Sequence, residues 1–121
     1  MANHLMMIDA MNIDEAGTRF AKVCITDLTS GKKNDEVREE WGNLSLESVA
    51  NSLCFDYDNN HHWDLIFRCV EKALGEASID AKEIAFLSAT SWTYSTNGTR
   101  TLLPATPDDK ITSRVKEKFG I

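Results

Sequence analysis

The sequence lacks the two features that would direct a protein to a membrane or across it. None of its 121 residues belongs to an apolar run approaching the ~20 residues that a membrane-spanning helix needs. Its N-terminus also lacks a charged segment followed by an apolar one, which is the pattern of a secretory signal. We therefore expect a cytoplasmic protein that has no membrane partner.

Basic residues and cysteines are also few. The chain has 13 lysine and arginine residues against 19 aspartate and glutamate residues, which gives a formal net charge of -6. A nucleic-acid-binding surface usually carries a basic stripe, so this balance argues against a nucleic-acid partner. The three cysteines (Cys24, Cys54 and Cys69) each lie in or beside an apolar run. Their odd number suits buried free thiols in a reducing compartment better than a disulfide framework.

The residues that are present describe one modest globular domain. The chain is 42% hydrophobic and 26% charged, proportions that are typical of folded proteins. A continuous apolar run over residues 5–8 predicts a first strand that ends at Asp9. Residues 19–28 predict a second strand, residues 29–33 a turn, and residues 35–41 a more polar third strand. Together these segments predict an antiparallel meander whose last strand lies nearer the sheet edge.

A helix is predicted after the two cap residues Asn59 and Asn60. Apolar residues then recur at the helical period, and charged residues lie outside their stripe. The stripe consists of Trp63, Ile66, Phe67, Val70, Leu74 and Ala77. Residues 84–89 predict another buried strand. Strand, helix and strand joined by short links predict a right-handed crossover, which makes this strand parallel to an earlier one.

The C-terminal part has a different composition. Residues 93–106 are rich in threonine, serine, asparagine and glycine, and we predict a loop there. A helix is predicted to follow, with Pro107 at its first position and two aspartates near the positive end of its dipole. Ile111, Val115 and Phe119 recur every fourth residue, which predicts a short amphipathic helix.

The first two predicted strands carry the residue pattern of a phosphate- or metal-handling hairpin. Asp9 follows the first strand, where the sheet would fix the direction of its side chain. Gly17 and Thr18 lead into the second strand after a predicted loop over residues 11–16. Glycine lets backbone N–H groups approach a phosphate closely, and the threonine hydroxyl adds a donor. The plain alternative for Asp9 is a carboxylate that caps a turn. For Lys22, on the second predicted strand, the plain alternative is a solvated lysine without a functional role.

Short motifs between residues 5 and 91 resemble, in order and spacing, the N-terminal part of the FGGY carbohydrate kinases, and most of all their autoinducer-2 kinase branch. The motifs of the hairpin and third strand are Leu5-Met6-Met7-Ile8-Asp9-Ala10, Gly17-Thr18, Lys22, Asp27 and Glu40-Trp41. The motifs of the helix and the next strand are Phe55-Asp56, Asn60, Trp63, Cys69, Lys72-Ala73-Leu74, Ile79-Asp80, Glu83-Ile84-Ala85 and Ser88-Ala89-Thr90-Ser91.

Two features depart from the family pattern. Residues 11–16 are inserted before Gly17, so that Asp14 competes with Asp9 for the role of the family's aspartate. We favour Asp9 because a strand positions it. Arg19 and Phe20 stand where the family has small or hydroxyl residues.

The resemblance implies an α/β fold, namely a ribonuclease-H-like (actin-like ATPase) half-domain in which a three-stranded antiparallel meander is followed by a helix and a parallel strand. It implies a truncated kinase N-terminal-like domain over residues 1–92, with a divergent loop and a short helix over residues 93–121. The implied reaction is ATP-dependent phosphorylation of a hydroxyl on a sugar or sugar-like metabolite. The family's catalytic aspartate and adenosine pocket lie beyond this length, so no catalytic residue is assigned and the isolated chain is expected to be inactive.

The resemblance also implies the site residues and the cofactors, ATP and Mg²⁺. The phosphate-facing residues would be Asp9, Gly17, Thr18 and Lys22, with Asp9 also at the metal. The substrate-facing residues would be Ser88, Thr90 and Ser91.

Besides the sugar-like substrate, the expected partner is a missing C-terminal domain or a second copy of the chain. The alternative function is a non-enzymatic interaction or regulatory module derived from the same fold, because a truncated sheet exposes its edges and an apolar face. A two-metal nuclease set of Asp9, Asp14, Asp27 and Glu40 is a further alternative, against which the acidic balance argues.

Overall fold

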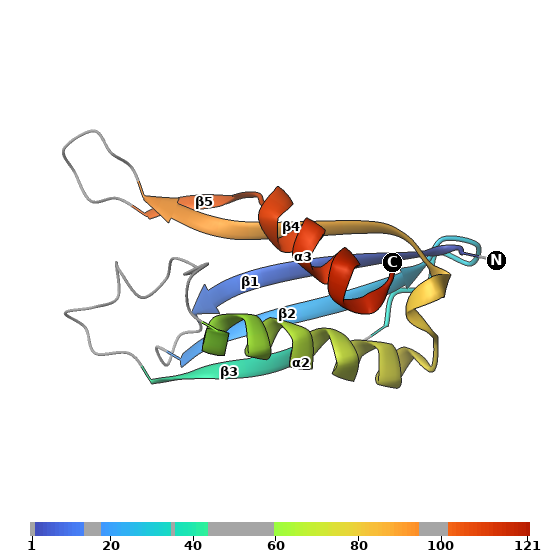
Figure 1. Ribbon diagram of the computed structural model, residues 1–121, viewed down its shortest axis with the longest axis horizontal. Coiled ribbons are helices and arrows are strands. Elements are labelled where there is room, and N and C mark those ends of the chain that lie inside the picture. The colour runs from blue at the N-terminus through green and yellow to red at the C-terminus, as the bar shows by residue number, and fades with distance from the viewer. Residues whose placement is uncertain (1, 14–17, 35, 44–59, 95–101) are drawn as a thin grey trace.

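In the described part of the chain, five strands form one mixed β-sheet and two α-helices lie on the same face of it, as the computed structural model shows (Figure 1). The structure describes residues 2–13, 18–34, 36–43, 60–94 and 102–121. The strands are β1 (His4–Ile13), β2 (Thr18–Asp27), β3 (Val37–Asn43), β4 (Ile84–Tyr94) and β5 (Leu102–Pro107). The helices are α2 (Asn60–Ala77) and α3 (Asp109–Phe119), and a single 3-10 turn, η2 (Ala81–Glu83), precedes β4. The strand order is β3-β2-β1-β4-β5, which makes this an α/β protein.

The first three strands form the predicted antiparallel meander, and β3 lies at the edge of the sheet. The prediction that β1 stops at Asp9 is wrong. Between the pairs Asp9–Lys22 and Asn12–Phe20, two residues of β1 face one residue of β2, which is the arrangement of a β-bulge. The bulge absorbs the extra residue and pairing resumes, so residues 11–13 are strand rather than loop. The rest of that predicted loop lies outside the described residues.

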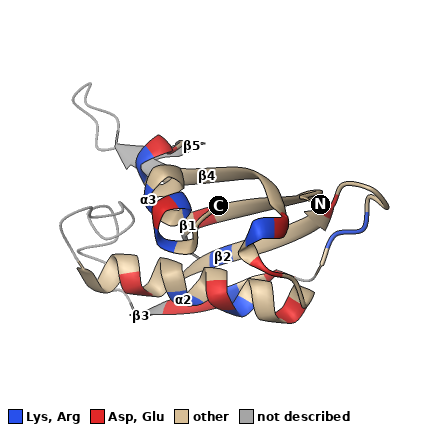
Figure 2. Cartoon of the chain, turned by 45° about the vertical axis from the view of Figure 1, so that its right-hand side comes forward, with Lys and Arg blue, Asp and Glu red and all other residues tan. Residues whose placement is uncertain are grey.

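The predicted helix and the strand after it are confirmed. Helix α2 begins at Asn60 and ends at Ala77, and β4 pairs with β1 in parallel. Charged residues lie along both helices, as expected for helices with one apolar and one polar face (Figure 2). No helix in the described ranges is long and apolar enough to cross a membrane.

The predicted loop over residues 93–106 is wrong where the structure describes it. Residues 93–94 complete β4, and Leu102–Pro107 forms β5, which pairs antiparallel with β4. Strand pairing satisfies the backbone N–H and C=O groups of a segment whose polar composition resembles that of a loop. Pro107 therefore closes a strand and does not open the helix.

Helix α3 is capped at both ends by side-chain and backbone groups. Its N-cap is Asp108, whose Oδ1 accepts hydrogen bonds from the backbone N–H groups of Lys110 and Ile111, each at 3.1 Å. Gly120 follows the last turn with a φ of 70°, and its N–H donates to the carbonyl of Lys116. Glycine adopts this left-handed conformation without the steric penalty that a side chain would bring.

The core lies between the helices and one face of the sheet. Alternate residues of the two central strands are buried there, with Met6 and Ile8 on β1 and Val23 and Ile25 on β2. The helices contribute Trp63, Leu65, Ile66, Cys69, Val70, Ala73, Ile111 and Val115. Most of the predicted apolar stripe of α2 is thus buried or packs against this core.

The thiol of Cys69 is fully buried beneath α2, where its S–H donates to the carbonyl of Val37 at 3.4 Å. Burial raises the pKa of this thiol to about 12. Cys24 is also buried and free, as predicted, and Cys54 lies outside the described residues.

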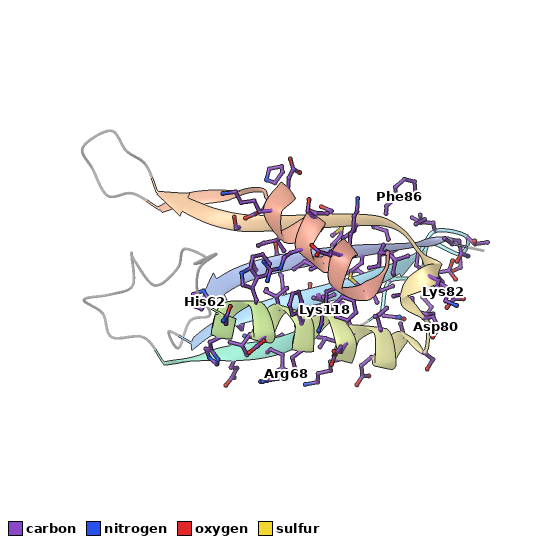
Figure 3. All side chains as sticks on the ribbon, viewed as in Figure 1. His62, Arg68, Asp80, Lys82, Phe86 and Lys118 are labelled. Atoms are coloured by element: carbon purple, nitrogen blue, oxygen red, sulfur yellow. The ribbon has the colours of Figure 1, made fainter. Side chains whose placement is uncertain are left out.

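The opposite face of the sheet carries no helix of the described chain (Figure 1). Residues of β1 and β4 that alternate with the core residues point to this side, and two of them are large, apolar and exposed. Met7 is 44% exposed and Phe86 is 63% exposed, and Phe86 extends outward from β4 (Figure 3).

Replacing the N-cap of α3 tests its contribution to stability. We expect Asp108→Ala to lower the free energy of unfolding by about 1–3 kcal/mol, because it removes a cap and leaves a buried hydroxyl without its acceptor. Asp109→Ala changes the same residue type one position later, where the side chain is exposed, and serves as control. Equal urea midpoints for the two variants would contradict the assignment.

The raised pKa of Cys69 predicts a loss of stability at alkaline pH. Above the ordinary thiol pKa the unfolded chain gives up the proton that the folded chain keeps up to pH of about 12. This thiol should therefore lower the free energy of unfolding by ~1.4 kcal/mol per pH unit once the pH exceeds about 9. Urea unfolding at several pH values should show a shallower decline for Cys69→Ala, and parallel declines would refute the effect.

Candidate functional site

A pocket of about 270 Å³ opens on the face of the sheet that the helices leave uncovered. Its polar wall is made by six side chains: Asp9, Lys22, Lys33, Glu36, Ser88 and Thr90. Met7 and Cys24 supply apolar surface between them. The pocket therefore combines two carboxylates, two ammonium groups and two hydroxyls around a small apolar patch.

Strand register brings the central residues of the pocket together. On β1, Asp9 lies opposite Lys22 of β2 and opposite Thr90 of β4. Two residues earlier, Met7 lies opposite Cys24 on one side and Ser88 on the other. Residues directly opposite each other on neighbouring strands share a face of the sheet. Because Met6, Ile8 and Ala10 must face the core, Met7 and Asp9 face the pocket.

Both carboxylate oxygens of Asp9 have partners. The hydroxyl of Thr90 donates a hydrogen bond to Oδ1, and the ammonium of Lys22 lies 3.5 Å from Oδ2. The side chains of Lys22 and Asp9 are 30% and 35% exposed, so water still reaches the pair. Two partners on two different strands hold the carboxylate in a defined orientation.

Opposite charges alternate across the pocket from Asp9 to Lys33. Lys22 lies 3.7 Å from Oε1 of Glu36, and Lys33 lies 3.6 Å from the same oxygen. These side chains are partly exposed, so each pair contributes roughly 0–1 kcal/mol to stability. These ion pairs therefore hold the charged side chains of the pocket in position and contribute little to the stability of the fold.

Cys24 lies beneath these charges, and burial raises the pKa of its thiol. Glu36 and Asp9 raise it further, whereas Lys33 and Lys22 oppose the change. A thiol whose pKa is raised stays protonated at neutral pH and is a poor nucleophile. Cys24 is therefore a weaker candidate for a functional group of the pocket than its charged groups and hydroxyls.

The structure brings together four of the residues that the sequence proposed for the site: Asp9, Lys22, Ser88 and Thr90. Ser91 points to the other side of the sheet, where its hydroxyl donates to Oδ2 of Asp108 at 2.7 Å. Consecutive residues of a strand face opposite ways, so Thr90 and Ser91 cannot line the same pocket.

The Gly-Thr corner is described only in part. Thr18 begins β2, which pairs with β1 as predicted, and nothing of its side chain is described. Gly17 lies outside the described residues, so its place relative to Asp9 stays a prediction.

Lys33 and Glu36 were missed by the sequence reasoning, which assigned Lys33 to a turn and gave Glu36 no role. Thr26 forms an isolated bridge with Lys33, which fixes the chain just before β3. Arg38 pairs with Lys22 in the sheet, so Glu36, two residues earlier, falls on the same face. The alternation of side chains along the third strand is the sequence signal that could have identified Glu36.

The metal alternatives gain no support from the described residues. No group of three or more histidine, cysteine, aspartate and glutamate side chains is arranged there so that it could hold a metal ion. Of the four carboxylates in the two-metal hypothesis, Asp14 is not described, and Asp27 accepts hydrogen bonds from the N–H groups of Thr29 (2.8 Å) and Ser30 (3.3 Å). Those bonds lower the pKa of Asp27 and serve its own turn.

Comparison with curated proteins identifies similar sequences. The chain is similar to autoinducer-2 kinases. It is 32% identical over 120 residues to the enzyme of Salmonella typhimurium (strain LT2), an alignment that covers 95% of this chain and 21% of the relative. The autoinducer-2 kinases of Enterobacter sp. (strain 638) and Klebsiella pneumoniae are 32% and 30% identical over 108 residues, 85% of this chain and 20% of theirs.

The chain spans about a fifth of the length of the curated relatives that it matches. The resemblance seen in the sequence is thereby confirmed, and a match over 95% of the chain extends it beyond Ser91 into β5 and α3. No family model matches the chain, and no solved structure matches it significantly.

Loss of the Thr90 hydroxyl tests the hydrogen bond to Asp9. We expect Thr90→Val, which keeps the shape of the side chain, to lower the free energy of unfolding by about 1 kcal/mol. Ser88→Ala removes a nearby exposed hydroxyl of the same strand and should cost less. Chemical denaturation of both variants decides the matter, and an equal effect would count against the bond.

Proposed function

We propose that this chain forms the phosphate-facing half of a phosphotransfer site in a carbohydrate-kinase-like protein. The reaction would be ATP-dependent phosphorylation of a hydroxyl on a sugar or sugar-like metabolite. The observation that carries the proposal is the cluster of Asp9, Lys22 and Thr90 on the neighbouring strands β1, β2 and β4. The relatives are named for a kinase activity on autoinducer-2, which supports a small sugar-like substrate.

The proposed chemistry requires few catalytic groups. Phosphoryl transfer depends mainly on positioning and on stabilisation of charge at the phosphate oxygens. Lys22 supplies a positive charge within reach of an incoming phosphate, and Gly17 and Thr18 would add backbone and hydroxyl donors. Ligands of α/β sheets bind near the carboxyl ends of parallel strands, and Asp9 and Thr90 form the last pair along the parallel ladder of β1 and β4, although both strands continue beyond it.

Asp9 fits the role of a single Mg²⁺ ligand. Mg²⁺ in kinases is usually bound by one or two carboxylates, with phosphates and water completing its coordination. When bound with ATP, the ion neutralises charge that develops on the transferred phosphoryl group. A supply of ATP also favours the cytoplasm as the place of the reaction.

The fold that we propose is a ribonuclease-H-like half-domain. An antiparallel meander followed by a helix and a strand parallel to β1 supports this assignment. In kinases of this kind the site lies between two domains, so the opposite wall of the cleft would come from another polypeptide segment. We infer that the isolated chain binds the phosphates of ATP and does not complete the transfer, because charge stabilisation needs groups from both walls.

Nucleotide binding and turnover test the proposal together. We expect the purified chain to bind MgATP by calorimetry, and Lys22→Gln to weaken that binding by about tenfold. Lys72→Gln is the matched control, since Lys72 pairs with Glu39 and does not line the pocket. A coupled assay with candidate sugars should detect no turnover.

Turnover by the isolated chain would overturn the half-site assignment. Absence of MgATP binding would instead favour the non-enzymatic alternative, and equal binding by Lys22→Gln and Lys72→Gln would remove the phosphate role of Lys22.

A further inference from the structure

We propose that Lys33 and Lys22 together form a site for a phosphate group, and that the carboxylate of Glu36 occupies this site until a ligand displaces it. The inference rests on the proposed function for the nature of the ligand. It assigns roles to two residues, Lys33 and Glu36, that the resemblance to kinases does not supply.

The geometry around one oxygen atom carries the inference. The ammonium groups of Lys22 and Lys33 lie 3.7 Å and 3.6 Å from Oε1 of Glu36. Two cations from different segments, β2 and the approach to β3, thus converge on a single anionic oxygen. A phosphate oxygen at the same position would meet the same two charges, so Glu36 acts as an internal stand-in for an anionic ligand.

Exchange of Glu36 for a ligand is open to solvent. The side chains of Glu36 and Lys33 are 42% and 51% exposed, so the carboxylate can leave the pocket for water. Asp9 also pairs with Lys22, but the hydroxyl of Thr90 holds its other carboxylate oxygen in place. A phosphate would therefore replace Glu36 and leave Asp9 in position.

The pocket has room for a phosphate group and is slightly smaller than the pockets that enclose a whole small-molecule ligand. Its volume of about 270 Å³ lies below the roughly 300–1,000 Å³ of pockets that enclose an entire small-molecule ligand. The exposed Ser88 on β4 lines the same pocket, and its hydroxyl adds a neutral donor. The shared chemistry is a phosphate group, carried by a nucleotide or by a phosphorylated sugar.

Paired variants with the same change of net charge test the site. The 121-residue chain is titrated calorimetrically with sodium tripolyphosphate at low ionic strength, and in a second series with glucose 6-phosphate. We expect Lys33→Gln to weaken binding by about tenfold. Lys32→Gln alters the neighbouring lysine, which does not line the pocket, and should leave the affinity nearly unchanged.

Removal of the internal carboxylate should have the opposite effect. We expect Glu36→Gln to tighten binding by about two- to fivefold, because the ligand no longer competes with it. Glu39→Gln changes a carboxylate that pairs with Lys72, away from the pocket, and controls for the change in net charge. The two probes are also compared with each other. If tripolyphosphate binds more tightly than glucose 6-phosphate, the source of the phosphate is a nucleotide; if glucose 6-phosphate binds more tightly, the source is a phosphorylated sugar.

Three results would overturn the inference: no binding of either probe, equal affinities for Lys33→Gln and Lys32→Gln, or equal affinities for Glu36→Gln and Glu39→Gln. Its failure can be told apart from failure of the proposed function. If MgATP binding depends on Lys22 but not on Lys33 or Glu36, the proposed function stands and this inference falls. If the probes bind as expected but MgATP does not, the phosphate site stands without the kinase assignment.

Discussion

The central position of β1 is the constraint on which the rest of the structure depends. This strand pairs antiparallel with β2 on one side and parallel with β4 on the other, so every neighbouring side chain takes its position from it. Because side chains alternate along a strand, burial of Met6 and Ile8 under the helices forces Met7 and Asp9 to the opposite face. The core and the pocket are therefore two consequences of one alternation, and neither can shift in register without the other.

The same alternation on β4 joins the pocket to the last helix. Thr90 contacts Asp9 on the uncovered face, and Ser91 contacts Asp108 on the helix face. Asp108 in turn caps α3 and donates its own backbone N–H to the carbonyl of Ala89 at 2.8 Å. Two consecutive residues of β4 thus contact Asp9 on one face of the sheet and the N-cap of α3 on the other.

Sequence patterns were sufficient for the elements whose side chains repeat at one clear period. The stripe that begins at Trp63 predicted α2, and the apolar runs predicted the meander and the parallel strand. The errors lie where backbone pairing, rather than side-chain pattern, decides the structure. The bulge after Asp9 depends on two residues of β1 facing one of β2, and β5 depends on hydrogen bonds to β4 that a polar composition does not reveal. Lys33 could not be assigned to the pocket, because an isolated bridge with Thr26 fixes its position, whereas the alternation of residues along β3 could have placed Glu36 beside Lys22.

The face of the sheet that the described helices leave open has a consequence for how this polypeptide contacts other surfaces. Phe86 and Met7 expose apolar surface beside the charged pocket, on a parallel strand pair of the kind that proteins normally sandwich between two layers. Without such a layer, the ring of Phe86 is exposed to water, and other apolar surfaces can bind to it. A partner surface that covered this face would remove the ring of Phe86 from water.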